Sequence, residues 1–189
     1  MTNPMPPFVE FPKIPRLSRG MVVTEKIDGT NAQVHITEDG RILAGSRTRW
    51  ITPQDDNYGF AAWVEAHKDE LRNLGPGSHF GEWWGQGIQR RYGLNEKRFS
   101  LFNVGRWGPG ARDEAIRPAC CSVVPVLYAG DFSVEEIDAR ITSLQAMGSV
   151  AAPGFMQPEG VVVFHVASRT LYKKTIEKDA EPKGLRGAA

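Results

Sequence analysis

The stretch TEKIDGTNAQVHI, residues 24–36, contains the pattern from which the rest of this chain can be understood. Polar and apolar residues alternate on both sides of Asp28-Gly29, which is typical of two strands joined by a turn. Lys26 stands at the end of the first strand, directly after Glu25. Most lysines are solvated surface residues, so the pattern leaves two readings of Lys26, a surface residue or a nucleophile.

Further strands are predicted on both sides of this stretch. Asp39-Gly40 is a hairpin signal that follows the second strand. Lys26 is therefore expected at a strand end, in a chain rich in short strands. Other β-rich runs cover residues 79–85, 99–104, 122–130 and 160–166.

Two long helices are predicted between the strands. Helical spacing covers residues 56–77, with Asp56 or Asn57 as the cap and an end at Gly75-Pro76. A second helix begins at Ser133, where Ser133 and Glu136 form a capping box, and ends at Gly148. The order of elements predicts one α+β domain over residues 1–189.

Composition excludes several classes of protein. With 41% apolar and 24% charged residues, the 189-residue chain is neither disordered nor membrane-spanning. No export signal is visible, which predicts a cytoplasmic protein. Cys120 and Cys121 are adjacent and are expected to be reduced, buried thiols. The net charge of +1 is too small for nucleic-acid binding by charge alone, although local basic clusters such as Arg90 and Arg91 could line a groove or simply face solvent.

A lysine that attacks phosphorus must be neutral, whereas an ordinary lysine is protonated at neutral pH. Neighbouring cations or a metal ion favour the neutral amine. A lone K-x-D-G is weak evidence for such a site. Here it is followed by five further motifs, which are GSRT at 45–48, FGEWWGQGIQ at 80–89, RFSLFNV at 98–104, PEGVVV at 158–163 and YKKTIEKD at 172–179.

In this order, the six motifs resemble the covalent nucleotidyltransferases, and within them the phage-type and editing-type ATP-dependent RNA ligases. The resemblance covers about residues 20–180. It implies an ATP-grasp-like nucleotidyltransferase domain, with antiparallel sheets flanked by helices and a nucleotide pocket between them. It also implies that a lysine takes AMP from ATP, that AMP passes to a 5′-phosphate, and that a 3′-hydroxyl displaces it.

The resemblance assigns a role to each motif. It implies that Lys26 carries AMP, that Glu25 and Asn31 lie beside the nucleotide, that Arg47 lies on the ribose or phosphate side, that Glu82 binds the ribose hydroxyl, that Phe102 stacks on adenine, that Glu159 helps to hold Mg²⁺ or Mn²⁺, and that Lys173 binds the α-phosphate. Other readings remain open. Arg47 could form a surface ion pair, Glu82 could pair with Arg90 or Arg91, and Phe102 could belong to the core. Trp83 and Trp84 are packing residues or a rim for nucleic acid.

The last motif departs from the family pattern, which sets two lysines two residues apart on one strand face. Here Lys174 directly follows Lys173, and Thr175 comes next. Because strand side chains alternate, Lys174 is expected to point away from Lys26 while Thr175 holds the inward position. Lys178 is a candidate to replace the second lysine.

The length of the chain after the last motif predicts a monomeric catalytic domain without a C-terminal OB-fold or helical domain. The resemblance implies that it acts on RNA or DNA ends in a nicked or bridged duplex. A partner protein could deliver this substrate. Two alternatives stay open: a DNA ligase or GTP-using capping-type enzyme, and a noncatalytic module that binds nucleotide or RNA ends. Retention of Lys26, Glu82, Glu159 and Lys173 argues against the noncatalytic module.

Overall fold

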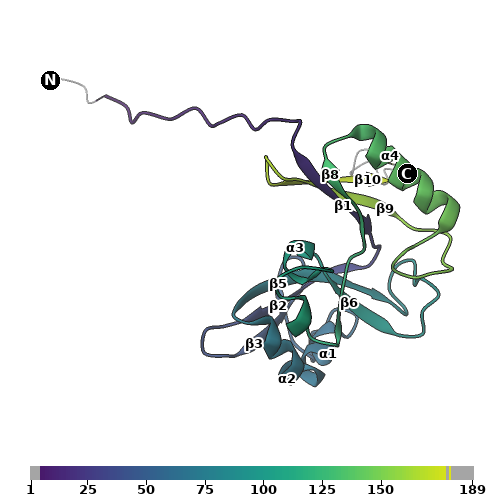
Figure 1. Ribbon diagram of the computed structural model, residues 1–189. Helices are drawn as coiled ribbons and strands as arrows, with labels where there is room; N and C mark the ends of the chain where they lie inside the picture. The colour runs from purple at the N-terminus through teal and green to yellow at the C-terminus, as the bar shows by residue number, and fades with distance from the viewer. Residues whose placement is uncertain (1–4, 178, 180–189) are drawn as a thin grey trace, which may run out of the picture.

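The computed structural model describes residues 5–177 and residue 179. Strand β1 (Gly20–Lys26) lies inside a four-stranded antiparallel sheet with the order β10-β9-β1-β8 (Figure 1). The other strands of this sheet are β8 (Val126–Asp131), β9 (Gly160–His165) and β10 (Thr170–Thr175). Helix α4 (Val134–Met147) covers one face, where Leu144 packs with Val23 and Val161. The opposite face is left for the site of Lys26.

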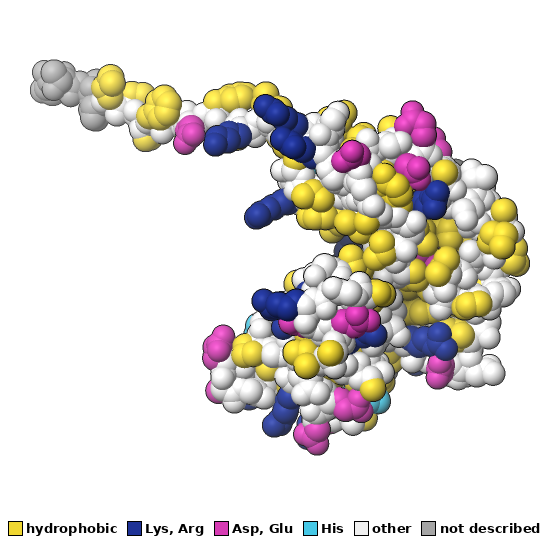
Figure 2. All heavy atoms as spheres, viewed as in Figure 1, with side chains coloured by type: hydrophobic (Ala, Val, Ile, Leu, Met, Phe, Trp, Pro, Cys, Tyr) yellow, Lys and Arg dark blue, Asp and Glu magenta, His cyan; other side chains and the backbone are white. Residues whose placement is uncertain are grey.

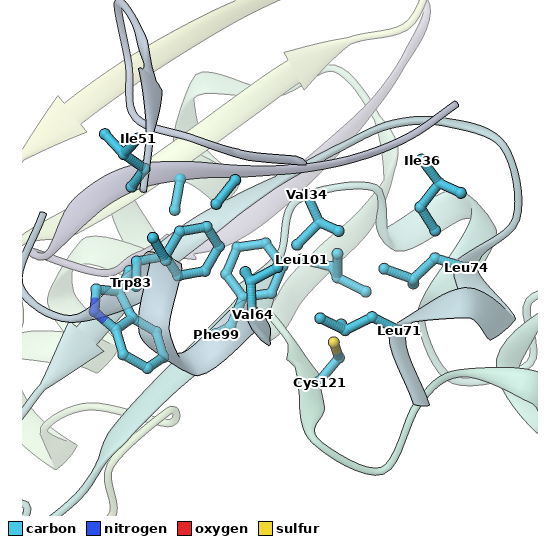
Figure 3. Close-up of a cluster of buried hydrophobic side chains, with 14 of the residues drawn as sticks. Val34, Ile36, Ile51, Val64, Leu71, Leu74, Trp83, Phe99, Leu101 and Cys121 are labelled. Atoms are coloured by element: carbon cyan, nitrogen blue, oxygen red, sulfur yellow. The ribbon is translucent and has the colours of Figure 1, made fainter. Parts of the chain in front are cut away.

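The chain passes from β1 directly into a second sheet, whose order is β4-β3-β2-β5-β6-β7. All of its neighbouring strands are antiparallel except β6 and β7. Its strands are β2 (Thr30–Ile36), β3 (Ile42–Gly45), β4 (Trp50–Ile51), β5 (Gly77–Gly85), β6 (Lys97–Leu101) and β7 (Cys121–Val123). The alternation of β2 buries Val34 on the helix side, in the core that also contains Phe99 and Trp83 (Figure 3).

Short helices flank this second sheet. They are α1 (Phe60–Ala66), α2 (Lys68–Leu71), the 3₁₀ turns Arg72–Leu74 and Glu114–Ile116, and α3 (Val104–Trp107). The two sheets form two lobes, and the surface is hollowed between them (Figure 2). Residues 5–17 extend away from β1 as an arm with exposed apolar side chains (Figure 1). None of the helices in the described part of the chain is long and apolar enough to cross a membrane.

The predicted fold class is confirmed: this is an α+β protein with two sheets flanked by helices. Helix α4 has the expected ends, because the Ser133 hydroxyl accepts the Glu136 amide at 3.1 Å and Gly148 has a φ of 83°. Trp83 and Trp84 are packing residues, only 2% and 1% exposed. Both cysteines are free thiols as expected, although only Cys121 is fully buried.

The prediction of one long helix over residues 56–77 is wrong. Gly59 is at the N-cap position of α1, although the Asp56 carboxylate accepts the first-turn amides of Ala61 and Ala62 at 2.8 and 3.0 Å. The helix then breaks at His67, whose φ of −111° is not helical. The His67 ring bonds to the carbonyl of Trp63 at 2.8 Å and stacks on its indole. The His67 backbone amide still donates to the Trp63 carbonyl at 3.1 Å, but its backbone leaves helical geometry, so α1, α2 and a 3₁₀ turn replace one helix.

Candidate active site

The end of β1 brings Lys26 against a carboxylate from the far end of the sequence. Lys26 pairs with Gly160 across β1 and β9, which places the preceding residue, Glu159, beside it. The Lys26 Nζ donates to Glu159 Oε2 at 2.6 Å. Both side chains are about four-fifths covered, with 23% and 18% exposed. The amine of Lys26 and the carboxylate of Glu159 are thus held together in a mostly buried position that solvent still reaches.

A second carboxylate, Glu82, belongs to the same site. It lies on β5 opposite Asn31 of β2, and its oxygens accept the Asn31 side-chain amide and the Gly29 backbone amide, each at 3.0 Å. Gly29 approaches β5 so closely that a Cβ there would stand 2.4 Å from the Trp83 carbonyl oxygen. The glycine of the K-x-D-G turn is therefore required by packing.

Burial changes the acidity of Glu82. Removal from water raises its pKa to about 7, against the lowering effects of the Lys26 charge and the bonds from Asn31 and Gly29. The nearby charge of Glu159 adds to the increase. These mutual effects place Lys26, Glu82 and Glu159 in one group of interacting charges. Neither Arg90 nor Arg91 contacts Glu82, so the alternative of a simple Glu82–arginine pair fails.

Glu25 has a different position from the one expected of a nucleotide ligand. Its side chain is 1% exposed and accepts the Ser149 hydroxyl at 2.6 Å and the amides of Val150 and Ala151 at 2.8 and 2.9 Å. Alternation along β1 directs it away from the Lys26 side chain. The carboxylate thus anchors the loop after α4, and a nucleotide-binding role for Glu25 remains only a prediction.

Phe102 lies on the open face of the second sheet. Phe99 and Leu101 on β6 are 0% and 1% exposed, whereas Phe102 is 40% exposed, and its amide donates to the Phe80 carbonyl at 2.9 Å. By alternation, Phe102 therefore lies on the same side of the sheet as Ser100, the partner of Glu82, and not on the side of Phe99 and Leu101. The alternative that Phe102 belongs to the core is wrong, because 40% of its side chain is exposed.

Arg47 lies in the exposed turn between β3 and β4. It borders a groove of about 280 Å³ that also includes Gln33 and Trp50. Gln33 is two residues beyond Asn31 on β2, so this groove lies on the same sheet face as the Asn31–Glu82 pair. Among the described residues, Arg47 has no carboxylate within ion-pair distance, in contrast to Arg49, which pairs with Asp55. A larger cavity of about 550 Å³ lies on the α4 side of the other sheet, beside Phe132 and Val163.

The register of β10 agrees with the expected inequality of its lysines. Lys173 pairs with Val162, and Thr175 pairs with Gly160, the partner of Lys26. Lys173 and Thr175 thus share the face of Lys26. Lys174 instead forms an ion pair with Asp138 on α4, on the opposite face. The candidate replacement Lys178 lies outside the described residues.

The carboxylates fit a hard divalent cation. The described residues contain no group of three or more metal-ligating side chains. Mg²⁺ is commonly held by one or two carboxylates together with substrate phosphates, a donor set that Glu159 and Glu82 can supply in part.

Sequence reasoning did not anticipate that Arg90 and Tyr92 contact Asp28, in the turn after Lys26, at 3.0 and 2.7 Å. The signal was the glycine-rich run 85–93, which permits an unusual backbone.

Comparisons with known proteins bear on the family and the fold of this chain. A family model described as RNA ligase matches residues 19–177. One solved structure of a Naegleria gruberi RNA ligase variant without ligand is 19% identical, with a TM-score of 0.61, and the match covers 88% of this chain and 53% of that one. A variant with ATP and Mn is 18% identical, with a TM-score of 0.61, covering 85% and 51%. A variant with AMP and Mn is 18% identical, with a TM-score of 0.58, covering 88% and 53%.

This likeness confirms the nucleotidyltransferase-type fold, and the chain spans about half the length of these structures. A comparison with curated protein sequences gave no match.

Proposed function

Because this chain belongs to the RNA ligase family, we propose that it is an ATP-dependent RNA ligase that joins 3′-hydroxyl and 5′-phosphate ends through an AMP carried on Lys26. One observation carries the proposal. Lys26, Glu82 and Glu159 come from three distant parts of the sequence and form a single group of interacting charges. Such a group of a nucleophile and two carboxylates has no structural purpose that apolar packing would not serve better.

In the first step, Lys26 Nζ attacks the α-phosphorus of ATP. An N–P bond forms, the bond between the α-phosphorus and the pyrophosphate oxygen breaks, pyrophosphate leaves, and Nζ gives its proton to water, which reaches the partly exposed Lys26 side chain. Glu159 holds the amine in place before the attack, and the Asn31–Glu82 pair offers polar groups for the ribose. Phe102, exposed on the same sheet face, offers a flat surface for adenine. Lys173 supplies positive charge on the Lys26 face of the other sheet.

Mg²⁺ or Mn²⁺ would be held by Glu159 together with the phosphates of ATP, and when bound it supplies charge neutralisation for the triphosphate. The nucleic-acid substrate is proposed to be an RNA end in a nicked or bridged duplex. A partner protein that delivers this end, and a monomeric state of the chain, belong to the same proposal.

The test is covalent labelling of the isolated protein by ATP labelled at the α-phosphate, with Mg²⁺ or Mn²⁺, followed by a denaturing gel. Wild-type protein and a Lys68→Ala control, altered at an exposed position of α2, should take the label, and Lys26→Ala should take none. Label that persists on Lys26→Ala contradicts the assignment. Labelling by GTP instead of ATP would favour a capping-type enzyme, and the absence of any label would favour a binding module. Transfer of the label to 5′-phosphorylated RNA and DNA then compares the two polynucleotides.

A further inference from the structure

A single guanidinium, that of Arg90, contacts three segments of the chain that each carry a residue of the proposed site. Its Nε donates to Asp28 Oδ2 at 3.0 Å, and Asp28 lies two residues after Lys26. Its Nη1 donates to the Gln157 carbonyl oxygen at 3.1 Å, two residues before Glu159. Its Nη2 stands 3.8 Å from Glu177, on the segment that follows β10 and Lys173.

The loop that presents Arg90 has an unusual backbone. Gln89, Arg91 and Tyr92 have φ values of 43°, 60° and 52°, and they are three of the five non-glycine residues with positive φ in the described chain. Side chains disfavour this region, so such residues persist only where the surroundings hold them. Their concentration around Arg90 indicates that the loop shape is maintained for the contacts it makes.

Buried aromatic packing holds this loop in place. Tyr92 is 2% exposed and its ring lies 4.9 Å from Trp84 and 4.6 Å from Phe155, centroid to centroid. Its hydroxyl accepts the Asp28 backbone amide at 2.7 Å. The loop therefore forms two hydrogen bonds with the turn after Lys26, one to the Asp28 backbone amide and one to the Asp28 side chain.

We propose that Arg90 is a positioning residue of the adenylylation site, which fixes the segments of Lys26, Glu159 and Lys173 relative to one another. The proposal rests on the proposed function. The planar guanidinium has donors pointing in several fixed directions, whereas a lysine ammonium at the end of a flexible stem cannot hold three partners in one geometry. Small displacements of reacting groups cost much of the rate. Arg90 itself is assigned no contact with ATP or RNA.

The matched variants are Arg90→Gln, Arg90→Lys and the control Arg91→Gln, which changes the adjacent exposed arginine. Labelling by ATP is followed in single turnover over a range of ATP concentrations, alongside the melting temperature. Arg90→Gln should lose about 10- to 100-fold of the maximal rate, with the half-saturating ATP concentration nearly unchanged. Arg90→Lys should fold and should label at a rate between those of Arg90→Gln and the wild type. Arg91→Gln should label at the wild-type rate. A folded Arg90→Lys that labels at the wild-type rate would overturn the proposal.

A second measurement needs no ATP. Acetic anhydride at a fixed pH acetylates lysines, and mass spectrometry compares Lys26 with Lys13 on the exposed arm. In Arg90→Gln, the acetylation of Lys26 relative to Lys13 should rise several-fold, because Lys26 and Glu159 are no longer held together, and in Arg91→Gln it should not. Unchanged acetylation of Lys26 in Arg90→Gln contradicts the positioning role. If the wild type takes no label from ATP, the proposed function fails, and the acetylation ratio still decides whether Arg90 positions Lys26.

Discussion

At the scale of single residues, Glu82 shows how burial prepares a group for a site. A carboxylate so well covered is costly when charged, and the two bonds from Asn31 and Gly29 only partly offset this cost. The result is an acid that changes its protonation state near neutral pH. Any ligand that brings hydroxyls or positive charge to Glu82 would therefore also change its protonation.

The raised pKa of Glu82 predicts how stability depends on pH. Between the usual value of 4.5 and the folded value of about 7, the folded protein binds more protons than the unfolded chain, so stability falls as pH rises through this window. The full effect is up to about 3 kcal/mol. Glu82→Gln should therefore lose less stability than the wild type between pH 5 and pH 8 in urea unfolding. Parallel curves for the two proteins would contradict this, and the exposed Glu65→Gln serves as the control.

The different environments of Phe102 and Phe99 predict opposite consequences of their removal. Phe102→Ala should leave the melting temperature nearly unchanged, because 40% of the side chain is already exposed, and should weaken ATP binding by about 1–3 kcal/mol if the ring stacks on adenine. Phe99→Ala, in the buried core, should cost about 3–5 kcal/mol of folding stability. Calorimetric titration measures the binding of ATP, and urea unfolding measures the folding stability of each variant. An unfolded Phe102→Ala would return Phe102 to the core.

At the scale of elements, β10 shows how strand alternation turns adjacent identical residues into unequal ones. Lys173 lies on the face of Lys26, and Lys174 is paired with Asp138 behind the sheet. A one-residue shift in register would exchange them. In the observed register only glycine fits at position 160, because a Cβ there would stand 2.2 Å from the Lys174 carbonyl oxygen.

This register predicts that the two lysines contribute unequally to the first step. Lys173→Ala should slow labelling by ATP at least tenfold, because it removes a charge that assists the transition state. Lys174→Ala should keep nearly the full rate, since its partly exposed ion pair with Asp138 contributes only about 0–1 kcal/mol to stability. Labelling rates at fixed metal and low salt measure the difference. Equal losses, or a larger loss for Lys174→Ala, would mean that the register in solution differs.

At the scale of the whole molecule, positive charge is local. The net charge is only +1, and arginines such as Arg49, Arg90 and Arg98 are paired with carboxylates. Figure 2 shows Lys and Arg side chains on both sides of the hollow between the lobes and on the arm. RNA binding should therefore depend on a few phosphate contacts.

Few phosphate contacts predict weak and salt-sensitive binding. The affinity for a nicked RNA duplex should fall about 10- to 100-fold between 50 and 200 mM salt. Fluorescence anisotropy of a labelled duplex measures this dependence, with Arg41→Ala, which removes a cation paired with Asp39 on a remote hairpin, as the unchanged control. Tight binding that is independent of salt would indicate an interface made mainly of uncharged contacts.

The sequence by itself determined the elements and the family. Alternation around Asp28-Gly29, the hairpin at Asp39-Gly40 and the cap at Ser133 depend on neighbours a few residues apart, so they could be predicted locally. The order of the motifs then indicated the family, and it predicted the residues of the site. The break at His67 escaped this reasoning, because helical spacing of the apolar residues continues through it while the backbone of His67 departs from helical geometry.

Only the tertiary structure decided how the site is assembled. Lys26 meets Glu159 across 133 positions of sequence, and Arg90 meets Asp28 across 62. The first contact depends on the pairing of β1 with β9 in one sheet, and the second on how the two sheets are joined, and no local pattern specifies either. The same is true of Glu25, adjacent to the nucleophile in sequence but committed to the loop after α4. Sequence periodicity specifies which residues share a face of a strand, whereas the packing of the lobes determines what that face meets.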